Sequence, residues 1–251
     1  MLVPEVSVVI PAYNAAKYIE KAIASVFKQN VSLEIIVIND GSSDNLDSVI
    51  SEYKNLNNFV YIKNASNLGV AESRNIGVRV AKGDYIAFLD ADDWWRENKL
   101  REQLNIIKEK KCVLCYTGRE LADKEGKLTG NIIHTKKVVN YNKLLFHNTI
   151  ACSSVLVKTD IALEIPMKND EYHEDYLTWL MILKKYGTAY GIDKPLMVYT
   201  LSQNSKSRNK ISSAKKTFNV YRILGYGRMK SILFMSSHIL HSLIQYYLKN
   251  K

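Results

Sequence analysis

Acidic residues are missing from the last quarter of the chain. All 25 Asp and Glu residues lie at or before Asp193, and the segment from Lys194 to Lys251 holds 11 Lys and Arg residues without one acid. The formal net charge of +10 therefore arises entirely from this segment. A basic segment of this kind suits an anionic surface, which is either nucleic acid or the head groups of phospholipids.

Cysteines and long apolar runs are also scarce. Three cysteines, Cys112, Cys115 and Cys152, are too few for a disulfide framework in a chain of 251 residues, so we expect buried thiols and a reducing cytoplasm. The first five residues lack the basic start and the apolar stretch of a secretory signal peptide. The most apolar stretch, between Lys230 and Lys249, is interrupted by Ser, His and Gln, and is too polar for a membrane-spanning helix.

The composition suits one folded domain with an extension. With 47% hydrophobic residues, the chain can bury one large core. We expect a catalytic domain over residues 1–210 and a basic, amphipathic helical tail over residues 211–251.

Apolar strands alternate with helical patterns along the first half of the chain. Short links join them, which indicates a largely parallel sheet with right-handed crossovers. Strands are expected at Val6–Ile10, Leu33–Ile38, Phe59–Ile62 and Tyr85–Leu89, and helices at Ile19–Phe27, Leu46–Tyr53, Val70–Ala81 and Arg96–Lys110. The predicted fold class is α/β, with a Rossmann-like, mostly parallel central sheet flanked by helices and with a C-terminal helical extension.

The second half of the chain has weaker patterns. Strands are expected at Cys112–Thr117, Cys152–Val157 and Pro195–Tyr199, a short helix at Val138–His147, and a polar loop or hairpin at Glu120–Lys137. A further helix is expected to begin near Glu174 and Asp175, whose charges stabilise its positive end.

Three carboxylates follow the strand Tyr85–Leu89 within four residues. They are Asp90, Asp92 and Asp93. Carboxylates this close repel one another unless a cation or a set of donors neutralises them. One interpretation is a divalent metal on Asp92, with Asp90 free to bind a sugar hydroxyl. The other is an acidic N-terminus of the next helix, capped by Asp92 or Asp93.

Two other polar segments follow strands of the same predicted sheet. Pro11-Ala12-Tyr13-Asn14 follows the first strand, and Asp40-Gly41 follows the second. In open α/β sheets, ligands bind at the carboxyl ends of the strands, so these segments and Asp90-Ala91-Asp92 can form one pocket. An aromatic ring, a carboxylate for a base or ribose and a carboxylate for a metal together suit a nucleoside diphosphate.

Four stretches of the sequence resemble a known family. VSVVIPAYNAAKYIEKAIASVFKQ, EIIVINDGSSD, NLGVAESRNIGVRVAKGDYIAFLDADDWW and HEDYLTWLMILKKYG look like the inverting glycosyltransferases of family 2, which have the GT-A fold. The resemblance covers roughly residues 5–205. It implies transfer of one sugar from a nucleotide diphosphate donor, usually a UDP-sugar, to a hydroxyl group.

The resemblance also implies roles for single residues. Asp40 would bind the base, and Pro11, Ala12, Tyr13 and Asn14 would line the same pocket. Arg74 would help to hold the donor, Asp90, beside Ala91, would bind ribose or sugar hydroxyls, and Asp92 would bind the Mn²⁺ or Mg²⁺ that bridges the diphosphate. Asp175 matches the catalytic base, which an inverting transfer needs to take the acceptor proton.

The segment after Tyr199 departs from the family pattern. Many relatives have Arg or His soon after the matching tyrosine, whereas this chain has Thr200-Leu201-Ser202, which puts a further metal ligand in doubt. The loop from Ser202 to Lys210 either folds over the donor diphosphate or is a basic linker.

The tail predicts a membrane contact. On a helical wheel, His238 and His241 share an arc with Ser242 and Gln245, which leaves a broad apolar face next to basic residues. We expect an anionic membrane surface as partner, a glycan or lipid-linked acceptor in bacterial cell-surface polysaccharide or lipooligosaccharide assembly, and a cytoplasmic, peripheral location on the inner face of the cell membrane. The alternative is a helix that packs on the domain or on another subunit.

Two other functions remain as interpretations. A nucleic-acid-binding protein would explain the basic tail, but its aromatic residues alternate with Leu and Ile at helical spacing, which suits a membrane or a core better than base stacking. We therefore expect no nucleic-acid partner. A non-catalytic, nucleotide-sugar-binding protein would not need both Asp92 and Asp175.

Overall fold

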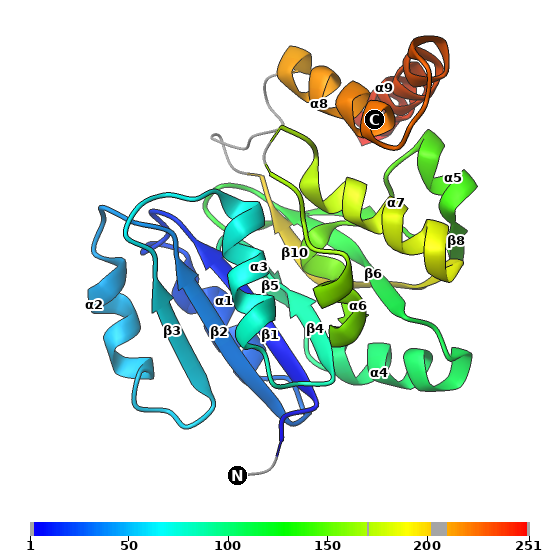
Figure 1. The fold of residues 1–251 in the computed structure, drawn as a ribbon. Coiled ribbons are helices and arrows are strands. Elements are labelled where there is room, and N and C mark those ends of the chain that lie inside the picture. The colour runs from blue at the N-terminus through cyan, green and yellow to red at the C-terminus, as the bar shows by residue number, and fades with distance from the viewer. Residues whose placement is uncertain (1–2, 170, 202–209, 250–251) are drawn as a thin grey trace.

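The computed structural model describes residues 3–169, 171–201 and 210–249. Its strands are β1 (Val6–Ala12), β2 (Leu33–Asn39), β3 (Phe59–Lys63), β4 (Tyr85–Phe88), β5 (Trp94–Trp95), β6 (Leu114–Ala122), β7 (Leu128–Ile133), β8 (Val138–Asn140), β9 (Leu156–Lys158) and β10 (Thr188–Thr200). They form one sheet in the order β3-β2-β1-β4-β9-β6-β10-β5, with β7 beside β6 and β8 beside β10 (Figure 1).

The helices that precede the C-terminal pair lie on both faces of this sheet (Figure 1). They are α1 (Ile19–Phe27), α2 (Leu46–Ile50), α3 (Val70–Val80), α4 (Lys99–Lys110), α5 (Tyr141–Phe146), α6 (Thr159–Glu164), α7 (Glu174–Tyr186), α8 (Lys210–Ile223) and α9 (Arg228–Lys249), with 3₁₀ turns at Ser51–Tyr53 and Cys152–Ser154.

The first half of the sheet is parallel, as the sequence predicts. β1 pairs in parallel with β2 and with β4, and β2 with β3. β9 then runs antiparallel between β4 and β6, although β6 and β10 are again parallel to each other. The predicted fold class, a mostly parallel sheet flanked by helices with helices at the C-terminus, is confirmed.

Each central strand is apolar on both faces because helices cover both. Val8 and Ile10 of β1 pack into a core layer with α1, α2 and α4, whereas Val9 packs into the opposite layer with α3, α6 and α7. All seven residues of β1 and of β2 are buried. This double burial explains why these strands appear in the sequence as continuous apolar runs rather than as alternating patterns.

Three predicted elements are wrong in part. Val138–His147 is not one helix, because Val138–Asn140 pairs with β10 and Asn140 then caps α5 by accepting a hydrogen bond from the Lys143 amide (3.0 Å). Cys152–Val157 begins as a 3₁₀ turn, and only its end is strand. The helix expected from Arg96 begins at Lys99, since Trp94 and Trp95 first pair with β10.

The remaining segments of the second half form a hairpin and a long strand. Glu120–Lys137 contains a hairpin, formed by β6 and β7. Pro195–Tyr199 is part of the longer strand β10. All three cysteines are buried free thiols, as expected.

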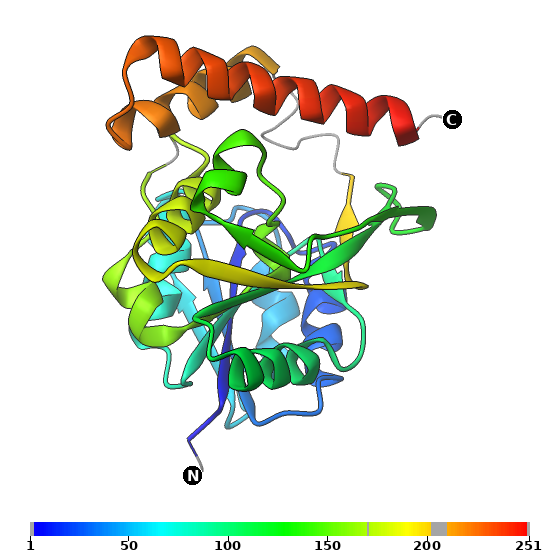
Figure 2. The same cartoon turned by 90° about the vertical axis from the view of Figure 1, so that its right-hand side faces the viewer.

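The two C-terminal helices lie across one end of the domain (Figure 2). α8 is anchored by Tyr221, which is fully buried and donates a hydrogen bond from its Oη to the Leu145 carbonyl (2.7 Å). α9 packs beside α5, where the rings of Phe146 and Phe234 meet edge to face at 5.2 Å. Among the described helices, none combines the length and apolar character that crossing a membrane requires.

Candidate active site

The ends of β1 and β2 are bonded to each other. The Asp40 amide donates to the Ala12 carbonyl (2.8 Å), and the Ser43 amide donates to Asn14 Oδ1 (2.9 Å). Asn14 adopts a left-handed conformation with φ of 50°, which turns the chain away from the strand. Tyr13 next to it is 53% exposed. The structure thus brings Pro11–Asn14 and Asp40 together, with an aromatic ring open to solvent.

Asp40 is buried and braces the loop before α3. Its carboxylate accepts hydrogen bonds from Asn64 Nδ2 (2.8 Å), from the Leu68 amide (2.8 Å) and from the Gly69 amide (2.9 Å). An ionised carboxylate has about four acceptor directions, so one is left for a ligand. Gly41 after it has φ of +70°, and a Cβ there would lie 2.7 Å from the Ser66 carbonyl carbon. Only glycine fits this turn.

The three aspartates after β4 have different surroundings. Asp93 is 2% exposed, and its carboxylate accepts from Ser153 Oγ (2.7 Å) and from the Thr200 amide (3.0 Å). Asp93 therefore ties the loop to the turn before β9 and to the end of β10. The alternative interpretation of Asp92 or Asp93 as helix caps is wrong, because β5 intervenes and Asn98 precedes α4.

Asp92 is the carboxylate best placed for a metal. Burial, and next the charge of Asp90, raise the pKa of Asp92 to about 6. Within the described residues, no other side chain donates a hydrogen bond to this carboxylate, and no three His, Cys, Asp or Glu residues group as a metal site. Magnesium-type cations commonly use one or two carboxylates together with substrate phosphates. The residues present fit a cation of this kind.

Lysines surround the opening next to Asp92. A cavity of about 150 Å³ is lined by Asp92, Trp94 and three lysines, Lys17, Lys21 and Lys124, together with Glu125, which pairs with Lys124. Lys21 lies over the Trp94 ring, and burial lowers its pKa. These cationic side chains are complementary to phosphate oxygens. Residues 202–209, in the loop expected to fold over the diphosphate or to act as a linker, lie outside the described residues.

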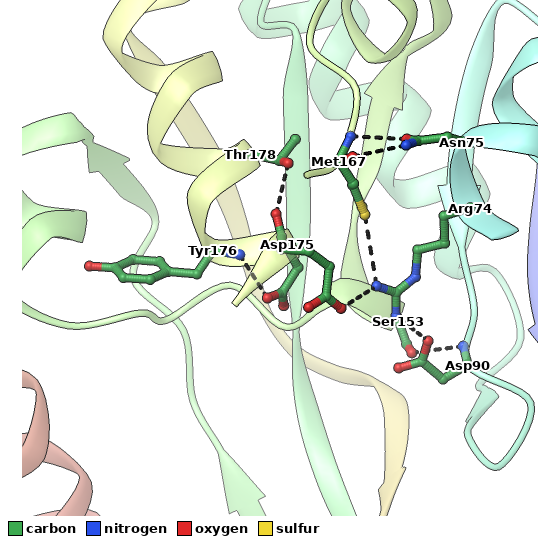
Figure 3. Close-up of polar contacts among 9 residues, drawn as sticks. Arg74, Asn75, Asp90, Ser153, Met167, Asp175, Tyr176 and Thr178 are labelled. Atoms are coloured by element: carbon green, nitrogen blue, oxygen red, sulfur yellow. Dashed lines mark hydrogen bonds and ion pairs between the residues drawn. The ribbon is translucent and has the colours of Figure 1, made fainter. Parts of the chain in front are cut away.

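Arg74 joins the aspartate loop to α7. Its guanidinium, 4% exposed, contacts Asp90 through Nη2 (2.6 Å) and Glu174 through Nη1 (2.9 Å). Figure 3 shows the guanidinium between Asp90 and Met167, whose sulfur is 3.8 Å from Nη1. The structure places Arg74 as a buried bridge between carboxylates. A direct contact of Arg74 with a donor stays a prediction.

Asp175 lies in the first turn of α7, next to this bridge. It accepts a hydrogen bond from the Tyr176 amide (2.7 Å) at Oδ1, as Figure 3 shows. Burial, and then the charge of Glu174, raise the pKa of Asp175 to about 7, although Arg74 opposes the shift. A carboxyl that exchanges its proton near neutral pH is suited to general base catalysis.

Two residues at the site have no signal in the sequence. Ser153 accepts from the Asp90 amide (3.0 Å) while it donates to Asp93, but it lies in a segment that was expected to be a strand. Arg119, on β6, has a charge that interacts with Asp93, Asp175 and Tyr199. A single arginine in a strand carries no motif, so only the fold identifies it.

The Arg74 bridge predicts a large loss of stability when it is removed. Arg74→Met leaves Asp90 and Glu174 without their shared cation, and we expect the free energy of unfolding at pH 7.5 to fall by about 3 kcal/mol. Urea unfolding measures it.

Arg79→Met is the matched control on the same helix. Arg79 pairs with Glu72 at 2.6 Å, but both side chains are about half exposed, so this variant should lose under about 1 kcal/mol. Equal losses in the two variants would contradict the bridge as a stabilising element.

Comparisons with known proteins agree on one family. A sequence model described as "Glycosyl transferase family 2" matches residues 7–158. The chain is 37% identical over 221 residues to the putative teichuronic acid biosynthesis glycosyltransferase TuaG of Bacillus subtilis, covering 87% of this chain and 88% of that protein. It is 30% identical over 242 residues to the UDP-Glc:alpha-D-GlcNAc-diphosphoundecaprenol beta-1,3-glucosyltransferase WfaP of Escherichia coli, covering 96% and 95%.

Solved structures share the fold at lower identity. Residues 1–349 of S. aureus TarS in complex with UDP-GlcNAc superpose with a TM-score of 0.73 at 18% identity, over 94% of this chain and 71% of that one. The mannosyltransferase PcManGT of Pyrobaculum calidifontis, in complex with GDP-Man and Mn²⁺, has a TM-score of 0.70 at 17% identity, over 94% and 70%.

Proposed function

The chain belongs to glycosyltransferase family 2, and we propose that it moves one sugar from a UDP-linked donor to a hydroxyl of a lipid-linked glycan, with inversion at the anomeric carbon. The observation that carries the proposal is the pair of ion contacts made by Arg74. Through them the aspartate loop at one sheet edge and the acidic start of α7 share one guanidinium. A donor held at Asp92 and a catalytic base at Asp175 would therefore lie in one active site.

The donor would occupy the edge formed by β1, β2 and β4. Tyr13 offers a ring for stacking, and Asp40 offers its remaining acceptor direction to a base N–H. Asp90 would bind ribose hydroxyls, and Asp92 would hold Mn²⁺ or Mg²⁺ against the diphosphate. The bound metal would supply positive charge for the departing diphosphate. Support for a UDP donor comes from WfaP and from the TarS complex, whose names include UDP-sugars.

Asp175 would remove the acceptor proton in a single displacement. A single displacement requires no enzyme nucleophile, so one carboxylate is enough to activate the hydroxyl. Arg74 holds Glu174 and thereby fixes the first turn of α7, from which Asp175 projects. Arg119 adds positive charge near the same carboxylate.

A transfer assay tests this function. The chain is incubated with Mn²⁺, decyl-diphosphate-linked GlcNAc and one nucleotide sugar at a time, either a UDP-sugar or a GDP-sugar, and the new linkage is identified by proton NMR. An α-linked donor should give a β-linked product. An α-linked product would contradict inversion, and transfer from GDP-sugars alone would contradict the UDP donor.

We also propose that α9 contacts an anionic membrane surface from the cytoplasmic side. Three of its polar residues contact the domain: Ser231 is fully buried, Ser237 Oγ donates to the Phe146 carbonyl (3.2 Å), and His241 stacks on His147 with ring centroids 5.1 Å apart. The opposite face is exposed and, apart from Ser236, mainly apolar. It comprises Met229 (87% exposed), Leu233 (61%), Leu240 (56%), Ile232 (51%) and Ile239 (40%). Packing on the domain and membrane contact thus use different faces of one helix.

Vesicle binding tests the exposed face of α9. The triple variant Ile232→Ser, Leu233→Ser and Leu240→Ser should bind phosphatidylglycerol vesicles at least about 100-fold more weakly, because each lost side chain removes roughly 1 kcal/mol of apolar burial. Co-sedimentation measures the binding.

The matched control removes three exposed leucines elsewhere in the domain. They are Leu56, Leu128 and Leu163, each 41–50% exposed. Their replacement by serine should leave vesicle binding unchanged. Equal binding by the α9 variant and the wild type would refute the membrane contact.

A further inference from the structure

A basic pocket lies where β8, α5 and α9 meet. Its volume is about 220 Å³, and its lining includes Lys136, Lys143, His147, Thr149 and His241. No Asp or Glu lines it, and none of the ion pairs found in the described part of the chain involves either lysine. We refer to these five residues as the basic pocket.

Hydrogen bonds to the rest of the domain fix the backbone at both lysines. The Lys136 carbonyl accepts a hydrogen bond from Tyr116 Oη (2.9 Å), and the next carbonyl, that of Lys137, accepts from the Gly191 amide (2.9 Å). The Lys143 amide is bound by the cap of α5. The backbone positions of both lysines are therefore fixed, and their exposed, flexible side chains can turn toward an anion in the pocket.

The cations around the pocket also act on its histidine. Burial, and then the charges of His241, Arg119 and Lys136, lower the pKa of His147 to about 4. Neighbouring cations destabilise the protonated form of His147, and the same electrostatic interaction attracts an anion.

The pocket lies beside α9, on the side of this helix that faces the domain. Arg119 is close enough to interact with His147 on one side and with Asp175 on the other. His241, on α9, forms the opposite wall. α9 crosses above α5 at this end of the molecule, as Figure 2 shows. Arg119 thus interacts electrostatically both with a residue of the pocket and with the proposed base.

We propose that the basic pocket binds the diphosphate group of a lipid-linked acceptor. The proposal rests on the proposed function, in which the acceptor hydroxyl meets Asp175 and its lipid stays in the membrane. The diphosphate is the part of such an acceptor that lies between sugar and lipid, and it is the part that two lysines recognise. The pocket is separate from the donor cavity, whose lysines are Lys17, Lys21 and Lys124.

Calorimetry with decyl diphosphate tests the proposal. UDP and Mn²⁺ are present in excess so that the donor cavity is filled. We expect the double variant Lys136→Ala, Lys143→Ala to bind decyl diphosphate at least about tenfold more weakly than the wild type, which corresponds to about 1.4 kcal/mol. The matched control, Lys168→Ala and Lys184→Ala, removes two lysines from a different cavity, on the α6 side of α7, and should bind as the wild type does.

Dihexanoyl phosphatidylglycerol separates the two possible sources of phosphate. Weak binding that does not depend on Lys136 and Lys143 is expected for this probe. If it binds as tightly as decyl diphosphate with the same dependence on the lysines, the pocket recognises membrane head groups and the proposal fails. Unchanged binding of decyl diphosphate by the double variant would also overturn it.

Acceptor kinetics distinguish failure of the pocket from failure of the function. With decyl-diphosphate-linked GlcNAc, the double variant should raise the acceptor KM about tenfold and leave the donor KM unchanged. With decyl GlcNAc glycoside, which lacks the diphosphate, both KM values should match those of the wild type. If the wild type transfers no sugar but binds decyl diphosphate through the two lysines, the proposed function falls and the phosphate subsite stands.

Discussion

Asp175→Asn lowers the kcat of sugar transfer by a factor of about 10²–10⁴, whereas the KM for the donor differs from that of the wild type by less than about twofold. The amide keeps the size and hydrogen bonding of the side chain but cannot take a proton from the acceptor hydroxyl. Initial rates at saturating donor measure the loss. Asp160→Asn, near the start of another helix on the same face of the sheet, is the control and should retain full activity.

The same substitution should stabilise the protein above neutral pH. The pKa of Asp175 is raised to about 7, so the folded state favours the protonated form and ionisation costs stability. The cost is absent below about pH 4, grows as the pH rises to about 7, and is constant above. We expect Asp175→Asn to gain about 1–3 kcal/mol at pH 8 and almost nothing at pH 3.5.

The pH profile of the wild type follows from the same shift. Only the ionised carboxylate accepts a proton, so kcat/KM should rise with pH through a limb near pH 7. If the Asp175→Asn variant is more stable but less active than the wild type, then Asp175 serves catalysis although it destabilises the fold. An active Asp175→Asn variant would remove Asp175 from the mechanism.

Asp92→Asn should abolish metal-dependent transfer, with kcat/KM reduced at least about 100-fold at 1 mM Mn²⁺. The neutral amide is a poor ligand for a hard divalent cation, and in the described chain no group of three carboxylates, histidines or cysteines replaces it. A titration of transfer rate against Mn²⁺ measures the effect.

Asp84→Asn is the control for this substitution. Asp84 is an exposed carboxylate directly before β4, at the opposite end of the strand that leads to Asp92. Its variant should show the wild-type dependence on Mn²⁺. If Asp92→Asn followed the same curve, the metal would bind elsewhere.

The sequence allows the donor side of the site to be predicted because its residues follow central strands. Pro11, Asp40 and Asp90 end strands that are buried on both faces, and such strands appear in the sequence as short apolar runs. Parallel pairing then brings their ends to one edge. Local pattern and topology are enough for this part.

The bridge and the basic pocket could not be predicted in this way. Arg74 and Glu174 are 100 residues apart, and nothing in either segment specifies the partner. Ser153 and Arg119 lie in elements whose bounds were wrong or incomplete, since β9 is short and antiparallel and β6 is longer than its apolar run. Lys136 and Lys143 line one pocket across a segment that was expected to be one helix but divides into β8 and α5.

The measurement that tests the central claim most directly is the thermal midpoint of unfolding with UDP, in the presence and absence of Mn²⁺, for the wild type and for Asp92→Asn. UDP at 100 times its dissociation constant should stabilise the wild type by about 2.7 kcal/mol, or roughly 5–10 °C, only when Mn²⁺ is present. Asp92→Asn should begin at an equal or higher midpoint, because it lacks a carboxyl of raised pKa, and should show no shift with UDP. An equal UDP shift without Mn²⁺, or in Asp92→Asn, would contradict a metal-dependent donor site at this edge of the sheet.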